Sequence, residues 1–355
     1  MPPPTILVIG AGQAGLAAGY HLRSTGLPFL IVDRAARPGE AWRQRYDSLT
    51  LFTPRRYSAL PGMALPGDPD GFASAGEFAD YLARYAAHFT LPLRLGAAVR
   101  RLRQDADGGF TAALAGGESL RADRVVVATG AFQYPVVPAL AAGADPDLPQ
   151  LTLADYRRPA QLPPGRILVV GDGASGRDIA AELAAAGRDV ILSGGRRRRL
   201  LPQAVLGRSS WWWLDRLGLL RTAPDGSVGR AMRRADPFPD RHRGRAGLAE
   251  RGVVLGPRLT GLNGRRARFA DGRSAEVAAI VWAVGYRDDT GWLDIPGAVG
   301  PDGRFRHCRG HAPVAGLYHL GRPWQHNRAS ALVMGAGPDA ARLVSVIAAS
   351  GCGPC

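Results

Sequence analysis

Three glycines near the N-terminus have a spacing that suits phosphate chemistry. Gly10, Gly12 and Gly15 form G-x-G-x-x-G directly after the apolar run 5–9 and before an Ala-rich stretch. In such a loop the first glycine permits a tight turn, the second lets a pyrophosphate approach the backbone, and the third lets a helix pack on a strand. The helix start then offers unpaired N–H groups and the positive end of its dipole. The spacing predicts a dinucleotide-binding loop.

An acidic residue follows this loop at the place where a ribose would lie. Asp33 ends the next apolar run, and a carboxylate there accepts hydrogen bonds from the ribose hydroxyls. The glycines alone are a weak signal, because glycine also serves close packing. The signal becomes specific for a dinucleotide-binding site when the loop stands in the order strand, loop, helix, strand and acid, as it does here.

A second glycine loop occurs in the middle of the chain, at 171–176, again between an apolar run and an Ala-rich stretch. Its following run ends in Ser193 instead of an acid, and four arginines occupy 196–199. An acid there would repel the 2′-phosphate of NADPH, whereas Arg pairs with phosphate bidentately. We therefore predict NADPH rather than NADH, with one or two of the arginines on the phosphate and the others in a solvated loop. The predicted contacts are Gly171, Gly173, Ser175, Gly176, Ser193, Arg196 and Arg197.

The elements that must position these loops form two copies of one plan. Residues 5–33 and 166–193 each run strand, glycine turn, Ala-rich helix, strand, which is a βαβ unit. Short β-like runs follow each unit and end in related strings, VVVATG and IVWAVGY. The sequence predicts an α/β protein with two Rossmann-like dinucleotide-binding domains of three layers (ββα).

The order of these elements predicts that one domain interrupts the other. Proline-rich stretches lead into the second unit, and a strand, a glycine turn and a helix over 317–347 return to the first. We expect a discontinuous first domain, residues 1–150 and 291–355, with residues 151–290 inserted as the second domain.

The chain resembles the class B flavin-dependent monooxygenases, which use FAD and NADPH on one chain and include the YUCCA-like enzymes. Beyond the two loops, the resemblance rests on G-x-x-W at Gly39–Trp42 and on residues 46–61, which look like the segment beside the flavin ring. Residues 200–220 and 316–335 look like small bacterial members. The resemblance covers essentially the whole chain. It implies a flavoprotein with FAD in the first domain, held by Gly10, Gly12, Gln13, Ala14, Gly15, Asp33, Arg34, Trp42 and Gly130.

The resemblance also implies a reaction. NADPH reduces the flavin, and a C4a-hydroperoxyflavin formed with O2 hands one oxygen atom to a nitrogen, sulfur or carbon centre of a small-molecule substrate. Two departures from the family weaken this inference. The pattern F-x-G-x-x-x-H-x-x-x-Y ends at Tyr156, but Pro146, Leu148 and Thr152 replace its Phe, Gly and His. Phe52 stands where related enzymes carry Asn or His, and Phe cannot hydrogen-bond to a flavin peroxide. Oxygen transfer therefore rests on resemblance and on no catalytic residue.

Two aromatic-containing stretches are candidates for the substrate side of the site. Trp324, Gln325 and His326 follow the expected strand 317–320, where the returning chain should reach the flavin. His326 is a candidate donor or proton-transfer group, a structural His is the alternative, and no general base is assigned. The Trp run 211–213 predicts either an apolar wall that excludes water or a helix packed between domains or subunits, and we favour the helix.

A flavin reductase or oxidase without oxygen insertion is the competing function. Low-molecular-weight thioredoxin reductases share the two-domain plan but carry C-x-x-C in the NADPH domain, and this sequence has none there. Cys352 and Cys355 form C-G-P-C at the C-terminus, where no helix follows to lower a thiol pKa, so a dithiol role is less favoured. A non-catalytic NADPH-binding protein would not need the first loop with Asp33.

Composition limits the partners. The net charge is +15, and all 45 basic residues are arginine. The arginines are scattered apart from 196–199, and no aromatic-plus-basic motif accompanies them, so we expect anionic dinucleotides and no nucleic acid. Three cysteines predict no metal site. We find neither a membrane-length apolar run nor a signal peptide, and therefore expect a cytoplasmic protein that does not insert into membranes. Exposed tryptophan would favour a homodimer.

Overall fold

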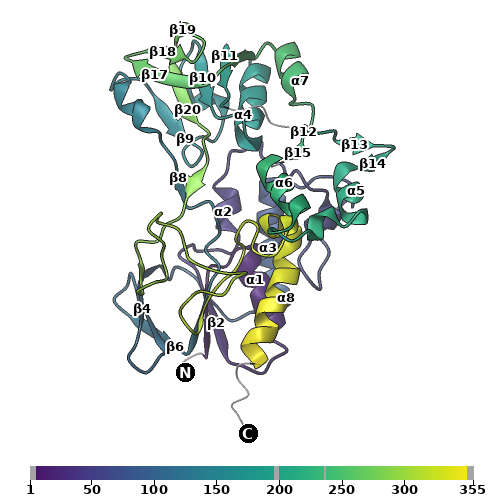
Figure 1. Cartoon of the computed structure of the whole chain (residues 1–355), viewed down its shortest axis with the longest axis vertical. Helices are drawn as coiled ribbons and strands as arrows, with labels where there is room; N and C mark the ends of the chain where they lie inside the picture. Colours follow the sequence, from purple (N-terminus) through teal and green to yellow (C-terminus); the bar gives the residue numbers. More distant parts are fainter. Residues whose placement is uncertain (1–4, 196–199, 236, 350–355) are drawn as a thin grey trace.

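Two parallel five-stranded sheets form the centres of two stacked folds (Figure 1). The computed structural model describes residues 5–195, 200–235 and 237–349. The first sheet has the order β23-β7-β1-β2-β3. Its strands are β1 (Ile6–Ile9), β2 (Phe29–Val32), β3 (Leu93–Arg94), β7 (Arg124–Val127) and β23 (Leu317–His319). β23 comes from the C-terminal part of the chain and pairs in parallel with β7 of this sheet.

The second sheet repeats this arrangement with the order β16-β11-β10-β20-β9. Its strands are β9 (Gln150–Thr152), β10 (Ile167–Val170), β11 (Val190–Ser193), β16 (Val254–Gly256) and β20 (Ala279–Trp282). In both folds the strand before the glycine loop is central and pairs in parallel on both sides. The predicted α/β class with two Rossmann-like folds is confirmed.

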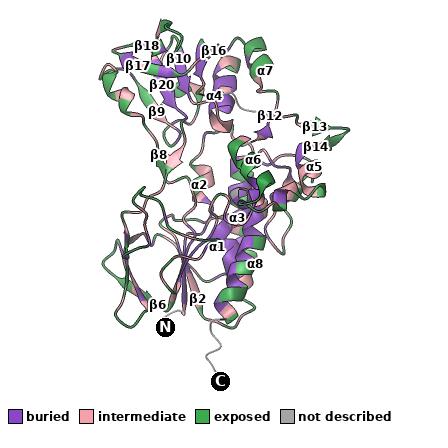
Figure 2. Cartoon of the chain, viewed as in Figure 1, coloured by how far each residue is buried: buried purple, intermediate pink, exposed green. Residues whose placement is uncertain are grey.

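The central strands are apolar throughout because both of their faces are buried. In β1, Ile6 and Val8 belong to the core shared with helices α1 (Gln13–Leu22), α3 (Ala75–His88) and α8 (Val333–Ala349). Leu7 and Ile9 belong instead to the core under a second sheet. That sheet contains β22 (Leu293–Asp294), β4 (Val99–Gln104), β5 (Phe110–Leu114) and β6 (Ser119–Ala122). Because side chains alternate between the two faces of β1, helices cover one face and the second sheet covers the other, which gives three layers (ββα). Figure 2 shows the buried residues gathered along these strands and helices.

The second fold has the same layers. Ile167 and Val169 of β10 lie in the core with helix α4 (Ala174–Ala185), whereas Leu168 and Val170 lie in the core under a small antiparallel sheet. That sheet contains β17 (Leu259–Asn263), β18 (Arg266–Phe269) and β19 (Ser274–Glu276).

Shorter elements connect these layers. The first fold adds α2 (Glu40–Arg43) and η1 (Arg55–Tyr57), and α3 begins with a capping box between Ser74 and Glu77. Between β9 and β10 lies η3 (Pro159–Gln161), and η5 (Arg328–Ala331) precedes α8. Between β11 and β16 lie β12 (Leu200–Leu201), β13 (Ala204–Val205), β14 (Arg208–Ser209), α5 (Ser210–Arg216), η4 (Leu219–Arg221), α6 (Ser227–Ala235), β15 (Phe238–Pro239) and α7 (Arg245–Glu250). Among the described residues, we find no helix of the length and apolarity that a membrane crossing requires.

The chain passes between the folds through one antiparallel ribbon, β8 (Tyr134–Pro135) paired with β21 (Tyr286–Arg287). The following η2 (Ala139–Gly143) already packs on the second fold, since a Cβ on Gly143 would overlap the Leu262 carbonyl oxygen. The limits expected at 150/151 and 290/291 stay a prediction. We propose the ribbon, near residues 135 and 287, as the natural division.

One core histidine makes stability depend on pH. His319 of β23 is 0% exposed, packs against Phe305 and His307 with ring centroids 5.0 and 5.6 Å away, and neither ring nitrogen has a hydrogen-bond partner. Burial, with smaller effects of His307 and Arg322, lowers its pKa to about 3. Between that value and 6.5, the unfolded chain binds a proton that the folded chain does not. Stability should therefore fall as the pH drops below 6.5.

We predict that His319→Phe removes this loss. Between pH 7 and pH 5 the wild type should lose about 2 kcal/mol more unfolding free energy than the variant, at about 1.4 kcal/mol per pH unit below 6.5. Urea unfolding at pH 7, 6 and 5 measures the difference. Equal pH slopes in the two proteins would contradict the assignment.

Candidate functional site

The first glycine loop lies at the carboxyl end of β1 and has one open position. Gly10 has φ +115, and a Cβ there would lie 2.5 Å from the Ala128 carbonyl oxygen. A Cβ on Gly15 would overlap the Gly10 carbonyl oxygen, so α1 packs directly against the loop. A Cβ on Gly12, which begins α1 without a side-chain cap, would meet nothing within 4 Å. The free space at a helix start is where a phosphate group fits.

The second loop has the same construction. Gly171 has φ +111 and abuts the Ala283 backbone, and a Cβ on Gly176 would overlap the Gly171 carbonyl oxygen. Gly173, which begins α4, again faces open space within 4 Å. Both loops lie where ligands bind in open α/β sheets, at the carboxyl ends of the strands.

The residues predicted around the first loop lie close together. Asp33 accepts hydrogen bonds from the Ala11 N–H (2.6 Å) and the Ala35 N–H (2.8 Å), and its carboxylate retains acceptor positions for ribose hydroxyls. Trp42 Nε1 donates to Gln13 Oε1 at 3.1 Å, which ties the G-x-x-W segment to α1. The Ala14 side chain is buried, and Arg34 is exposed.

A half-buried ion pair beside Gly130 was missed by the sequence reasoning. Arg322 donates to both oxygens of Asp288 at 2.7 Å and to the Gly130 carbonyl oxygen at 3.0 Å. Arg322 follows β23, Asp288 follows β21 and Gly130 follows β7. The hydrogen bonds of Arg322 therefore connect the ends of three segments beside the first loop. The local signal was weak, because Arg322 comes three residues after β23 and Asp288 follows the two-residue strand β21.

Beside the second loop, Ser193 is held by hydrogen bonds within the fold. Its hydroxyl donates to the Pro257 carbonyl oxygen (2.8 Å) and accepts from the Leu259 N–H (3.0 Å), and the residue is buried. These bonds hold the connection from β16 to β17, which accounts for a polar residue at this buried strand end. Ser175 is half-buried at the start of α4. Arg196 and Arg197 lie outside the described residues.

The three catalytic candidates point into different surroundings. Trp324 has φ +60, which is rare for a residue with a side chain, and its ring lies between the guanidinium groups of Arg233 (5.9 Å) and Arg328 (5.8 Å). Gln325 is buried and donates to the His319 carbonyl oxygen at 3.0 Å, so its amide supports the loop. The structure therefore does not bring the three side chains together as one catalytic group.

His326 lines a cavity of about 640 Å³ together with Arg309, His311 and Arg342. Burial, followed by the nearby Arg342 and Arg309, lowers the pKa of His326 to about 4. At neutral pH its imidazole is therefore uncharged. The neutral ring can donate one hydrogen bond and accept another, but it lacks the second ring proton that a general acid would transfer.

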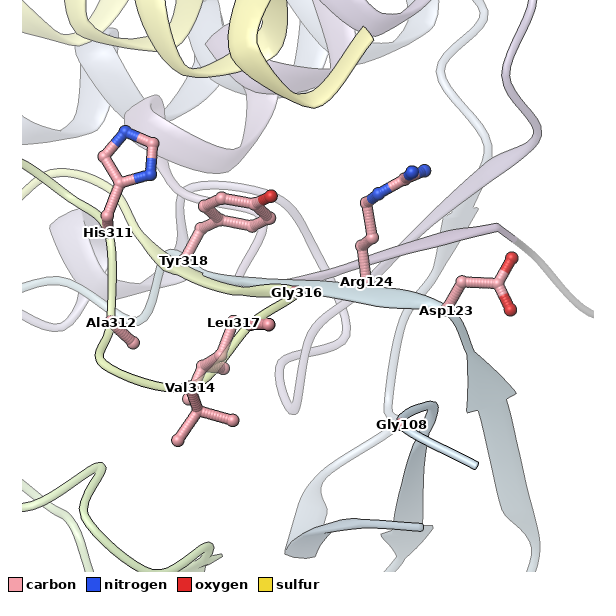
Figure 3. A pocket seen from close by; sticks show the side chains of 10 residues that line it. Gly108, Asp123, Arg124, His311, Ala312, Val314, Gly316, Leu317 and Tyr318 are labelled. Carbon is pink, nitrogen blue, oxygen red and sulfur yellow. The ribbon is translucent and has the colours of Figure 1, made fainter. Parts of the chain in front are cut away.

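A second cavity, of about 410 Å³, shares His311 with the first and lies beside the starts of β7 and β23. Figure 3 shows His311 and Tyr318 on one side of it and Asp123 and Arg124 on the other. Asp123 and Arg124 begin β7, so this cavity lies at the amino ends of the strands. Dinucleotides bind at the carboxyl ends, and the cavity is therefore separate from both glycine loops.

The Trp run packs as a helix on the segment that the resemblance places beside the flavin. Trp211 of α5 is 1% exposed, stacks on Phe52 with centroids 5.9 Å apart, and donates to the Phe52 carbonyl oxygen at 2.7 Å. Trp212 and Trp213 are half-buried and pack edge to face. Within the described ranges we find no group of His, Cys, Asp or Glu side chains suited to a metal ion.

Comparison with known proteins agrees with this geometry. A family model described as pyridine nucleotide-disulphide oxidoreductase matches residues 7–200, more than half of the chain. A CzcO-like oxidoreductase from Geobacillus kaustophilus is 41% identical, with 96% of this chain and 97% of that protein covered. The rice indole-3-pyruvate monooxygenase YUCCA1 is 29% identical over 83% of this chain and 80% of its own length. A flavin-containing monooxygenase from Stenotrophomonas maltophilia is similar in structure, with TM-score 0.82, 25% identity and 99% of both chains covered.

The family match and the 41% identical relative decide the assignment, and they agree with two dinucleotide loops on two Rossmann-like folds. The chain therefore belongs to the pyridine nucleotide-disulphide oxidoreductase family, among its class B flavin-monooxygenase-like members, and is an oxidoreductase whose cofactors are FAD and NADP(H).

Proposed function

We propose that this chain is an NADPH-dependent flavin monooxygenase that transfers one oxygen atom of O2 to a nitrogen, sulfur or carbon centre of a small molecule. FAD would be held by the loop at Gly10–Gly15 and by Asp33, and NADPH by the loop at Gly171–Gly176. Bound flavin supplies the redox and oxygen chemistry, and the protein supplies binding, orientation and exclusion of water.

The observation that carries the proposal is the pair of open glycines. Gly12 and Gly173 each begin a helix at the carboxyl end of a central strand, with room for a ligand that the flanking glycines lack. The likeness to a flavin-containing monooxygenase over 99% of both chains supports oxygen transfer as the reaction. Phe52 under the buried Trp211 supports a dry, apolar wall in this region.

A reductase or oxidase that inserts no oxygen is the second candidate. Phe52 favours it, because an apolar ring stands where related enzymes carry Asn or His. The dithiol variant of this candidate depends on Cys352 and Cys355, which lie outside the described residues.

We predict that NADPH bleaches the flavin absorbance under nitrogen and that ¹⁸O appears in a product when ¹⁸O2 is admitted. The substrates are a panel of small amines, thioethers and ketones, with mass spectrometry as the readout. Release of one H2O2 per NADPH with every substrate would favour the oxidase.

The loop assignment predicts different effects for two Gly→Ala changes in the first loop. Gly12→Ala leaves apoprotein stability within about 0.5 kcal/mol, because φ −81 suits alanine and the space is free, but it lowers FAD affinity at least tenfold. Gly15→Ala forces α1 away from Gly10 and destabilises the apoprotein by about 1–3 kcal/mol. Urea unfolding and FAD titration separate the two. Equal FAD affinity of Gly12→Ala and wild type would contradict the cradle.

Replacing Arg196 and Arg197 together by alanine tests the choice of nucleotide. We expect KM for NADPH to rise at least tenfold and KM for NADH to change little, because only NADPH carries the 2′-phosphate. A similar rise for both nucleotides would remove the phosphate role of these arginines.

A further inference from the structure

A cluster of charges around the buried Asp178 joins the two folds at α4. Asp178, two residues after Gly176, is 8% exposed. Its carboxylate accepts a hydrogen bond from the Tyr46 hydroxyl at 3.0 Å and one from Arg243, and Arg241 lies 3.5 Å away. A buried carboxylate is strongly unfavourable without such partners, so breaking any of these contacts should be costly.

Tyr46 reaches this helix from the other fold. It follows α2 of the first fold, yet its side chain, 3% exposed, belongs to the hydrophobic core of the second fold with Leu153 and Tyr156. Burial and the neighbouring Asp178 raise the pKa of Tyr46 well above its usual value, so the hydroxyl keeps the proton that it donates. A first-fold residue is thus anchored in the core of the second fold.

The two arginines complete the connection from a strained turn. Arg241 and His242 have φ +50 and +58, the left-handed region that residues with side chains rarely adopt. From this turn Arg241 donates to the side chain and carbonyl oxygens of Thr50 in the first fold. Arg177 of α4 donates to the Arg243 carbonyl oxygen at 2.8 Å. Such backbone strain persists only where its surroundings hold it in place.

We propose that Tyr46 and Asp178 are positioning residues that fix the orientation of the NADPH loop relative to the FAD loop. The inference rests on the proposed function, in which NADPH reduces the flavin. The ribbon of β8 and β21 connects the folds at one place, and the cluster at Asp178 is an anchor at another. Together with the ribbon and with the contact of Trp211 on Phe52, the cluster at Asp178 restricts rotation between the folds. Hydride transfer is sensitive to misplacement of about 1 Å, which costs on the order of 100-fold in rate.

The chain offers a closely matched control. The Tyr156 hydroxyl donates to Glu182 Oε2 at 2.8 Å, also on α4, from a buried ring to a half-buried carboxylate, but both residues belong to the second fold. Tyr156→Phe therefore deletes the same kind of hydrogen bond to the same helix without touching the contact between the folds. Tyr46→Phe and Asp178→Asn are the test variants, and Tyr46→Phe changes the packing least.

Two measurements test the proposal on the full chain. Stopped-flow reduction of the FAD-loaded protein under nitrogen gives the limiting rate and the NADPH Kd. Amide hydrogen exchange of the cofactor-free protein reports whether residues 44–52 stay anchored. For Tyr46→Phe we expect a limiting rate about 10–100-fold lower, an NADPH Kd within about twofold of wild type, and faster exchange in 44–52. Tyr156→Phe should change neither the rate nor the exchange of that segment.

Other outcomes overturn the proposal. The proposal is wrong if Tyr46→Phe has both the limiting reduction rate and the amide exchange of the wild type. It is also wrong if the variant binds NADPH more weakly while its limiting rate is unchanged. Failure of the flavin reduction by NADPH, the part of the proposed function on which this inference rests, would look different, because the wild-type flavin itself would stay oxidised with NADPH. The exchange of 44–52 alone then decides whether this contact anchors the folds.

Discussion

The whole arrangement depends on a backbone-to-backbone approach that only glycine permits. In each fold the helix after the central strand lies so close to the loop that a single methyl group on Gly15 or Gly176 would overlap a carbonyl oxygen. This approach sets where the helix begins and which of its N–H groups face outward. The open side at Gly12 and Gly173 follows from it, as does the edge of each sheet at which chemistry is possible.

Repetition of this unit explains the layers around it. Each central strand is covered by helices on one face and by a small sheet on the other, which is why β1 and β10 are apolar at every position. Two similar folds then have to be held together, and polar side chains do so. The half-buried Arg322–Asp288 pair and the cluster around the buried Asp178 lie where the connecting segments meet.

Local sequence was sufficient for the fold but not for the contacts between the folds. The βαβ units, the layers and the return of β23 were predictable because strand and helix periodicity and glycine spacing are local signals. Tyr46 and Asp178 are 132 residues apart, and on α4 an acid reads as a solvated residue, so no local pattern links them. Trp324, Gln325 and His326 are neighbours in sequence, but the positive φ at Trp324 turns them into different surroundings. Gly321 marks a turn here, but the residue type of Trp324 gives no sign of its own positive φ.

The pairing of β8 with β21 has a consequence for how such a chain can be assembled. Entry to and exit from the second fold are neighbouring strands, so the two ends of that fold nearly meet. A segment whose ends lie side by side can be inserted into a host loop without stretching either part. The shared ribbon therefore makes the insertion geometrically simple, whereas Tyr46 and Asp178 form a contact that any replacement of the second fold would have to rebuild.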